Sequence, residues 1–232
     1  MTTAPTTHDC NKTVNAVGIR CSAFLGCGPV AFWKQWIDLQ MRHNIEQVLT
    51  CSIKDFHFKG LNYVCFQFTP TLTIRLYITH ASEALDTENV SIHNHLYDSQ
   101  ILVLSGWIRN RVYRLVDGDE YHHYHLTSAL HPDNVEKKIR LNNLGKIGLE
   151  MTSERTLRPG DWHCQMHDEI HNVANDPNAL TGFMVFEFPT VKQHSIIFSK
   201  SEMGETIPTP GCYNRFERRE LLFLVNELLE AM

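Results

Sequence analysis

The sequence lacks any apolar run close to the roughly 20 residues that a membrane-spanning helix needs. Its first residues, Met-Thr-Thr-Ala-Pro-Thr-Thr-His-Asp, lack the basic and apolar segments of a secretory signal peptide. The formal net charge of −5 leaves no excess of lysine and arginine for binding nucleic acid or an anionic membrane. We therefore expect a soluble, cytoplasmic protein whose partner is a small molecule, with neither nucleic acid nor a membrane as partner.

The cysteines lack the pattern of a disulfide framework. There are seven of them, an odd number, in a chain of 232 residues, and no two form a Cys-x-x-Cys pair. We expect reduced thiols, which agrees with an intracellular location. The residue type in excess is histidine, with 14 copies gathered mainly in the middle of the chain. Histidine is therefore the first guide to a functional site.

Short β-branched and aromatic segments fill the middle of the chain, and turn residues separate them. Among the breaks are Asp117-Gly118-Asp119, Asn142-Asn143 and Pro159-Gly160-Asp161. Many strands at short, fairly even spacing predict an all-β barrel or a double-sheet jelly roll. The strands that we expect are 63–68, 71–78, 91–95, 100–105, 107–116, 121–126, 138–141, 149–152, 169–173, 182–188 and 195–198.

Both ends of the chain have the apolar spacing of helices, over residues 29–48 and 215–232. No internal repeat or low-complexity linker interrupts the chain, which predicts a single compact domain. Its expected parts are an N-terminal tail and helical extension packing on the barrel (1–58), the β-barrel (59–200) and a C-terminal segment with a helix (201–232).

His93 and His95 lie two positions apart in a β-rich segment. Residues i and i+2 of a strand point to the same face, so both imidazoles can meet at one point. A metal ion is the commonest reason for that convergence. A second histidine-rich segment, residues 121–125, has no matching turn motif downstream, and we interpret it as a polar outer strand.

A third metal ligand is expected farther along the chain, where His163, His167 and His171 recur every four residues. On a helix the three would share one face, as in helical zinc sites. However, the turn at Pro159-Gly160-Asp161 and the strand-like residues 170–173 argue against a helix. We favour His171 as the third ligand, with His167 as the alternative.

These segments resemble the two motifs of the cupin superfamily, and the resemblance spans roughly residues 60–200. Cupins carry a His-x-His, a Glu-type position and a glycine, followed by a Pro/Gly/Asp turn and a later histidine. The resemblance implies a cupin jelly roll, or double-stranded β-barrel, with an N-terminal helical extension and a C-terminal helix, and it implies a homodimer. The positions that match are His93, His95, Ser99 and Gly106, then Pro159-Gly160-Asp161 and His171.

Within the superfamily, segments 91–95 and 170–175 are similar to those of the cysteine dioxygenase-type enzymes. That family holds ferrous iron with three neutral histidines and no carboxylate. The resemblance implies that His93, His95 and His171 bind Fe(II), with open positions for substrate and for O₂ as co-substrate. Other divalent metals, such as Ni, Mn, Cu or Zn, also accept imidazole ligands.

Two segments depart from the pattern of that family. The position after His-x-His is Ser99 when counted back from Gly106, or Gln100 when counted forward from His95, and neither residue can form the thioether crosslink of mammalian-type members. Residues 184–189 contain neither tyrosine nor histidine, which the family has there. The resemblance therefore implies the iron site more firmly than a thiol substrate. No catalytic residue is identified, and the candidates are Ser99, Gln100 and Glu187.

Three arginines in the expected strands are candidates for binding substrate: Arg75, Arg109 and Arg111. An arginine that faces into a barrel needs an anion, because its charge cannot be buried unpaired. Bidentate capture of a substrate carboxylate is the functional interpretation. A surface position or a structural salt bridge is the alternative. Tyr113, which shares the parity of Arg109 and Arg111, completes the expected substrate-binding set.

The function that we expect is that of a mononuclear non-haem iron oxygenase, dioxygenase in type, acting on a small anionic or amino-acid-like substrate. One alternative is a metal-dependent cupin isomerase or lyase in which the ion acts only as a Lewis acid. Another is a non-catalytic cupin that binds a small molecule. Oxygen consumption separates the first from the second, and metal content separates both from the third.

Overall fold

Two antiparallel sheets of five strands make up most of the computed structural model, which describes residues 29–57, 59–80, 92–127, 140–204 and 212–232. The expected tail at 1–12 and the starts of the expected strands 91–95 and 138–141 lie outside these residues. The elements are α2 (Pro29–His43), α3 (Ile45–Cys51), β1 (Asn62–Phe68), β2 (Thr73–Thr79), β3 (Ile92–His93), β4 (Tyr97–Ser105), β5 (Ile108–Thr127), β6 (Arg140–Leu157), β7 (Trp162–Gln165), β8 (Ile170–Asn175), β9 (Thr181–Thr190), β10 (Ser195–Ser199) and α4 (Arg218–Ala231).

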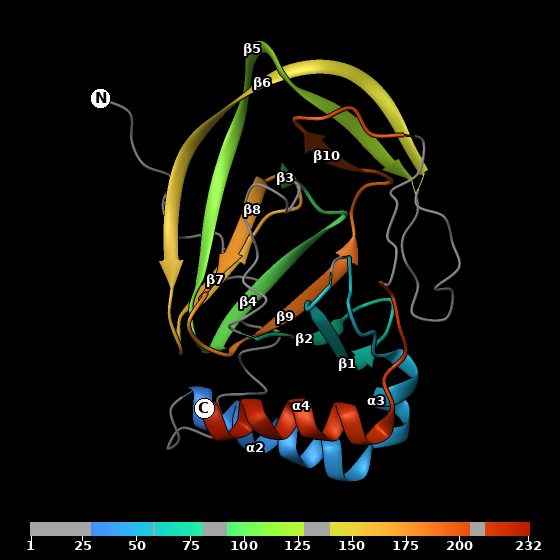
Figure 1. The fold of residues 1–232 in the computed structure, drawn as a ribbon, viewed down its shortest axis with the longest axis vertical. Helices are drawn as coiled ribbons and strands as arrows, with labels where there is room; N and C mark the ends of the chain where they lie inside the picture. The colour runs from blue at the N-terminus through green and yellow to red at the C-terminus, as the bar shows by residue number, and fades with distance from the viewer. Residues whose placement is uncertain (1–28, 58, 81–91, 128–139, 205–211) are drawn as a thin grey trace.

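The two sheets pack face to face and enclose an apolar interior (Figure 1). The first sheet has the order β1-β2-β9-β4-β7 and the second has the order β10-β3-β8-β5-β6. Ile101 and Val103 of β4 meet Ile108 of β5 and Leu157 of β6 in one buried cluster. The predicted all-β, double-sheet fold with helices at both ends is confirmed.

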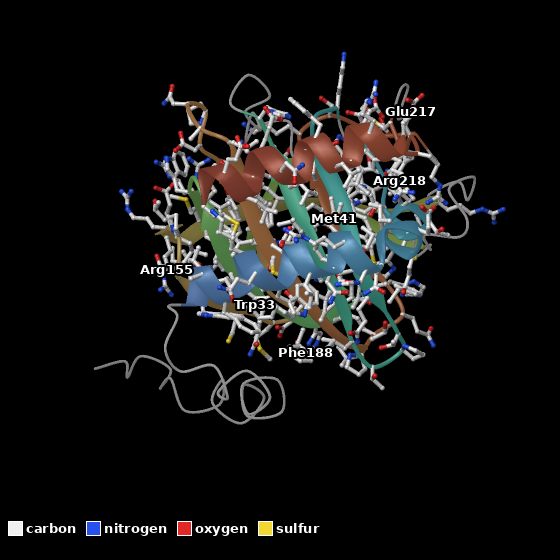
Figure 2. All side chains as sticks on the ribbon, turned by 90° about the horizontal axis from the view of Figure 1, so that it is seen from below. Trp33, Met41, Arg155, Phe188, Glu217 and Arg218 are labelled. Carbon is white, nitrogen blue, oxygen red and sulfur yellow. The ribbon has the colours of Figure 1, made fainter. Side chains whose placement is uncertain are left out.

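Helices α2 and α4 cover the outer face of the first sheet (Figures 1 and 2). Leu76, Leu102 and Phe186, all even-numbered, point from their strands into this helical layer and are fully buried. The ring centroid of Trp33 in α2 lies 5.1 Å from that of Phe186. Because side chains alternate along a strand, the odd-numbered residues of β2, β4, β7 and β9 face the space between the sheets.

Strands β5 and β6 form one long hairpin where the sequence predicted four shorter strands. The predicted breaks at 117–119 and 142–143 both lie within this hairpin. The first lies at a shift of the pairing register, and the second directly precedes another shift, between Asn143 and Lys146. Val116 and Tyr121 of β5 pair with the adjacent residues Gly148 and Ile147 of β6. Residues 117–120 therefore have no partner on β6 and form a bulge. Glycine fits at position 118, because a Cβ atom there would meet the Cα atom of Gly148 at 2.8 Å. The turn-forming residues thus interrupt the pairing without ending the strands.

The helices differ from prediction at their ends. The predicted helix 29–48 is two helices, separated at Asn44, whose φ of −126° and ψ of 19° leave the helical region. Helix α4 begins at Arg218 behind a capping box formed by Glu217 and Glu220. Among the described residues, no helix is both long enough and apolar enough to cross a membrane.

Candidate metal centre

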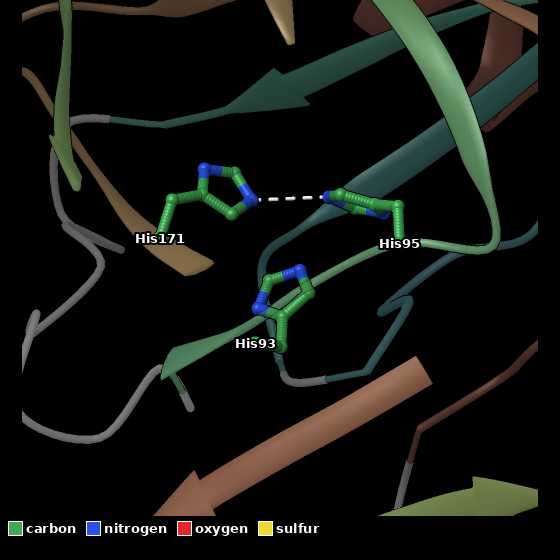
Figure 3. A group of neighbouring side chains, drawn as sticks. All are labelled: His93, His95 and His171. Carbon is green, nitrogen blue, oxygen red and sulfur yellow. Dashed lines mark hydrogen bonds between the residues drawn. The ribbon is translucent and has the colours of Figure 1, made fainter. Parts of the chain in front are cut away.

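Three histidines from two distant parts of the chain converge inside the barrel (Figure 3). His93 ends β3, His95 lies just beyond it, and His171 lies on β8 directly opposite His93 in the strand pairing. One ligand nitrogen from each lies within 4.8 Å of the other two. The Nε2 atoms of His95 and His171 are 3.0 Å apart. The expected convergence of His93 and His95 therefore exists, and His171 joins them.

The strand that was predicted to carry both His93 and His95 ends at His93. Hydrogen bonds hold the irregular segment after it. The backbone nitrogen of Asn94 donates to the carbonyl of Ile196 at 3.0 Å, and the Asn94 side-chain oxygen accepts from the Ile196 nitrogen at 2.7 Å. The backbone nitrogen of His95 donates to the carbonyl of His167 at 3.2 Å. The position of His95 therefore does not follow from strand alternation. The hydrogen bonds to Ile196 and His167 fix the backbone of this segment instead.

Asn110 of β5 sets which nitrogen of His171 carries the proton. The Nδ1 atom of His171 lies 2.7 Å from Oδ1 of Asn110, while Nδ2 of Asn110 donates to Glu169 at 3.2 Å. The amide oxygen therefore faces His171, whose Nδ1–H donates to it. This leaves the Nε2 lone pair of His171 pointing at the cluster, which is the tautomer that a metal ligand needs.

Burial favours the neutral form of two of the three histidines. Loss of solvent, and next the proximity of His93, lower the pKa of both His95 and His171 well below the usual value. Two nitrogens also crowd the Nε2 lone pair of His171, that of His95 at 3.0 Å and Nε2 of Gln165 at 2.6 Å. Neutral imidazoles with converging lone pairs suit a first-row divalent metal, so the residues present fit such an ion.

The other two members of the four-residue histidine repeat lie elsewhere, and the helical interpretation is wrong. His163 lies on β7 and His167 lies in the turn that follows it. The Nδ1 atom and the backbone nitrogen of His167 both contact Oδ1 of Asp98, at 2.7 and 2.8 Å. Asp98 therefore holds His167, and the structure brings His171, not His167, to His93 and His95. Among the described residues, segment 121–125 joins no such cluster.

A buried ion pair between Arg75 of β2 and Glu187 of β9 lies in the same interior. The Nη2 atom of Arg75 also donates to the hydroxyl of Tyr97 at 2.5 Å, and the Tyr97 ring centroid is 5.4 Å from that of His95. The Nε atom of Arg75 is buried without a hydrogen-bond acceptor among the described residues. Tyr97 therefore lies between the charge pair and His95 and contacts both. The guanidinium lies 5.1 to 5.7 Å from the ring centroids of Tyr63, Tyr77 and Tyr97.

The pairing of β4 separates the two candidates at the position after His-x-His. Ser99 pairs with Gln165 on one side and with Glu187 on the other, so all three side chains face the interior. Gln100 pairs with Cys164 and Phe186, so it faces the helical layer. Of the candidate catalytic residues, the structure therefore places Ser99 and Glu187 in the interior and Gln100 outside it.

The other predicted substrate-binding residues lie on the far face of β5. Asn110 points at His171, so by strand alternation Arg109, Arg111 and Tyr113 point away from it. The Nε atom of Arg111 lies 2.6 Å from Glu154, and that of Arg109 lies 3.7 Å from Glu154. The structure therefore does not bring these residues to the histidines. The anion that the two arginines meet is the carboxylate of Glu154, in their own chain.

Sequence reasoning missed three residues of the site: Asn110, Gln165 and Tyr97. Only Gln165 had a signal, since alternation in the short segment 162–165 puts it on the same face as His163. Asn110 lies between Arg109 and Arg111 in the sequence, and its contact with His171 depends on the pairing of β5 with β8.

The comparisons with known proteins add similarities of fold. No protein-family model and no curated protein matches the chain. Solved structures that it is similar to include hydroxypropylphosphonic acid epoxidase from S. wedmorenis, at 15% identity over 59% of this chain and 54% of that one, with a TM-score of 0.35. The match thus spans about half of the epoxidase.

Two further similar structures are named as cupins. One is a cupin superfamily protein from Desulfitobacterium hafniense, at 12% identity over 56% of this chain and 77% of that one, with a TM-score of 0.32. The other is a cupin-superfamily sugar phosphate isomerase from Silicibacter pomeroyi, at 14% identity over 56% and 60%, with a TM-score of 0.33.

Proposed function

We propose that the chain is a mononuclear non-haem iron oxygenase, dioxygenase in type, with Fe(II) bound by His93, His95 and His171 and O₂ as co-substrate. The observation that carries this proposal is the convergence of three imidazoles inside a barrel, beside a buried charge pair. Three protein ligands leave coordination positions open, which a catalytic metal needs and a structural metal does not. Ferrous iron bound there supplies the oxygen chemistry.

The chain's own residues orient the reactants and exclude water. Asn110 fixes the tautomer and the ring of His171 through the 2.7 Å contact at Nδ1. Ile101 and Val185 belong to the apolar cluster that fills the barrel on the same face as Ser99 and Glu187. A dry, apolar wall strengthens each polar contact to a bound substrate.

The substrate that fits this interior is small and zwitterionic, such as an amino acid. Arg75 and Glu187 present one charge of each sign near the histidines. The unpaired Nε edge of Arg75 is placed to donate to a substrate carboxylate, and Glu187 to accept from its ammonium group. A metal held by the three histidines would keep positions open for the substrate group that reacts.

Oxygen uptake by the iron-loaded protein tests the proposal. A panel of amino acids and small carboxylic acids is expected to contain a member that raises O₂ uptake well above the rate without substrate. The same member is expected to give no product without O₂ or with zinc in place of iron. Product formed under either of those conditions would contradict an oxygenase and identify an isomerase or lyase instead.

A further inference from the structure

We propose that Gln165 is a fourth protein ligand of the metal, bound through its side-chain amide oxygen. This inference rests on the metal site proposed above, and it adds an oxygen donor to the three nitrogens. Gln165 ends β7 in the first sheet and is 2% exposed, so the second sheet does not supply all of the ligands.

The head of the Gln165 side chain lies where a ligand atom would lie. Its Nε2 atom is 2.6 Å from Nε2 of His171, which is itself 3.0 Å from Nε2 of His95. Ligand atoms at right angles on a metal with bonds of about 2.1 Å are separated by about 3 Å. Nε2 of His171 is therefore separated from the terminal atoms of both Gln165 and His95 by nearly the spacing of neighbouring ligands.

The amide group can present either of its terminal atoms to this point. Oxygen and nitrogen of a glutamine side chain exchange places when the terminal torsion, which is broad and two-fold, turns by half a revolution. The nitrogen faces the free lone pair of His171 when that lone pair is the only partner. A divalent cation attracts the carbonyl oxygen and repels the N–H groups, so the oxygen turns inward when the metal binds.

The neighbouring strand leaves room for this side chain and offers no competing ligand. Ser99, which pairs with Gln165, is too short to fill the space that Gln165 occupies. Glu187, the partner of Ser99 on its other side, already pairs with Arg75. Gln165 is thus an oxygen donor within reach of the cluster, and because it is neutral it leaves the full charge of the cation for an anionic substrate.

Two substitutions distinguish a ligand from a residue that only donates a hydrogen bond to His171. Gln165→Glu keeps an oxygen at the same reach but removes the N–H donor. If Gln165 is a ligand, this variant binds Fe(II) at least as tightly as the unmodified protein, because the oxygen now carries charge. If Gln165 only donates to the Nε2 lone pair of His171, it competes with the metal for that lone pair, and Gln165→Leu then binds Fe(II) at least as tightly as the unmodified protein. Gln165→Leu removes both atoms and is expected to weaken binding by at least about 10-fold.

The measurement is the dissociation constant for Fe(II), from anaerobic competition with a chelator, together with the iron X-ray absorption spectrum. Gln193→Leu, on an exposed residue, is the matched control and is expected to leave both readouts unchanged. Unchanged affinity and an unchanged spectrum in Gln165→Leu would overturn the inference while leaving the three-histidine site intact. Weaker binding by Gln165→Glu would also overturn it. Absence of stoichiometric iron from the unmodified protein would overturn the metal site itself.

Discussion

Oδ1 of Asn110 lies 2.7 Å from Nδ1 of His171, on the side of the ring turned away from His95. This contact joins β5 to β8 across the sheet and fixes which nitrogen of His171 is free. The candidate metal centre therefore depends on a residue that carries no charge and binds no metal.

Asn110→Leu is expected to weaken metal binding without removing a ligand. Loss of the acceptor frees the tautomer and the ring of His171, and changes of this kind typically cost about 10- to 100-fold in metal affinity. Chelator competition measures the change. Asn178→Leu, in an exposed turn, is the control and is expected to keep the affinity of the unmodified protein. Equal affinities for the two variants would show that Asn110 has no part in the site.

Breaking the buried Arg75–Glu187 pair is expected to destabilise the fold. Arg75→Met leaves Glu187 as an uncompensated buried charge, which typically costs about 3–5 kcal/mol of unfolding free energy. Arg75→Met combined with Glu187→Leu removes both charges and is expected to recover most of that loss. Urea denaturation provides the comparison. A double variant as unstable as the single one would mean that packing, not the lone charge, causes the loss.

An exposed pair gives the scale for this experiment. Arg218 and Glu46 lie 2.6 Å apart with side chains that are 60% and 76% exposed. Water and salt screen such a pair, so Arg218→Met is expected to cost less than about 1 kcal/mol.

The metal-free protein is expected to lose stability in acid. Because the pKa values of His95 and His171 are lowered in the folded state, the unfolded chain takes up protons that the folded chain does not. The unfolding free energy is therefore independent of these groups above about pH 6.5. It falls below that pH, by up to about 1.4 kcal/mol per pH unit for each histidine, until the lowered pKa is reached.

Urea denaturation of the metal-free protein between about pH 5 and pH 8 measures this dependence. Replacing both His95 and His171 by glutamine is expected to make the acid slope shallower, while His194→Gln, on an exposed residue, is expected to leave it unchanged. An identical slope with and without His95 and His171 would rule out this origin of acid sensitivity.

The sequence was sufficient for the fold class and for the three histidines. Period-two apolar segments mark the strands, and the strand-like residues around His171 separate it from His167. The sequence could not decide between Ser99 and Gln100, because only the pairing of β4 with β7 and β9 shows which of them faces inward. The same limit holds for Arg109 and Arg111. Their shared parity puts them on one face of β5, but the sequence alone left open whether that face is the interior or the surface.

The features that the sequence could not predict depend on contacts between strands that are distant in the sequence. Gly118 looks like part of a turn until Gly148 is seen opposite it, 30 residues along the chain, where the two glycines make room for a bulge. Asn110 and Gln165 reach His171 from different sheets, and no local pattern links them. The residues that tune the site are therefore harder to predict than those that form it.

The most direct test of the metal centre compares the iron content of two histidine variants. Anaerobically loaded and desalted protein is expected to retain one Fe(II) per chain when unmodified and in His167→Ala, whose side chain binds Asp98. His171→Ala is expected to retain almost none. Full occupancy in His171→Ala, or its loss in a folded His167→Ala, would contradict the centre formed by His93, His95 and His171.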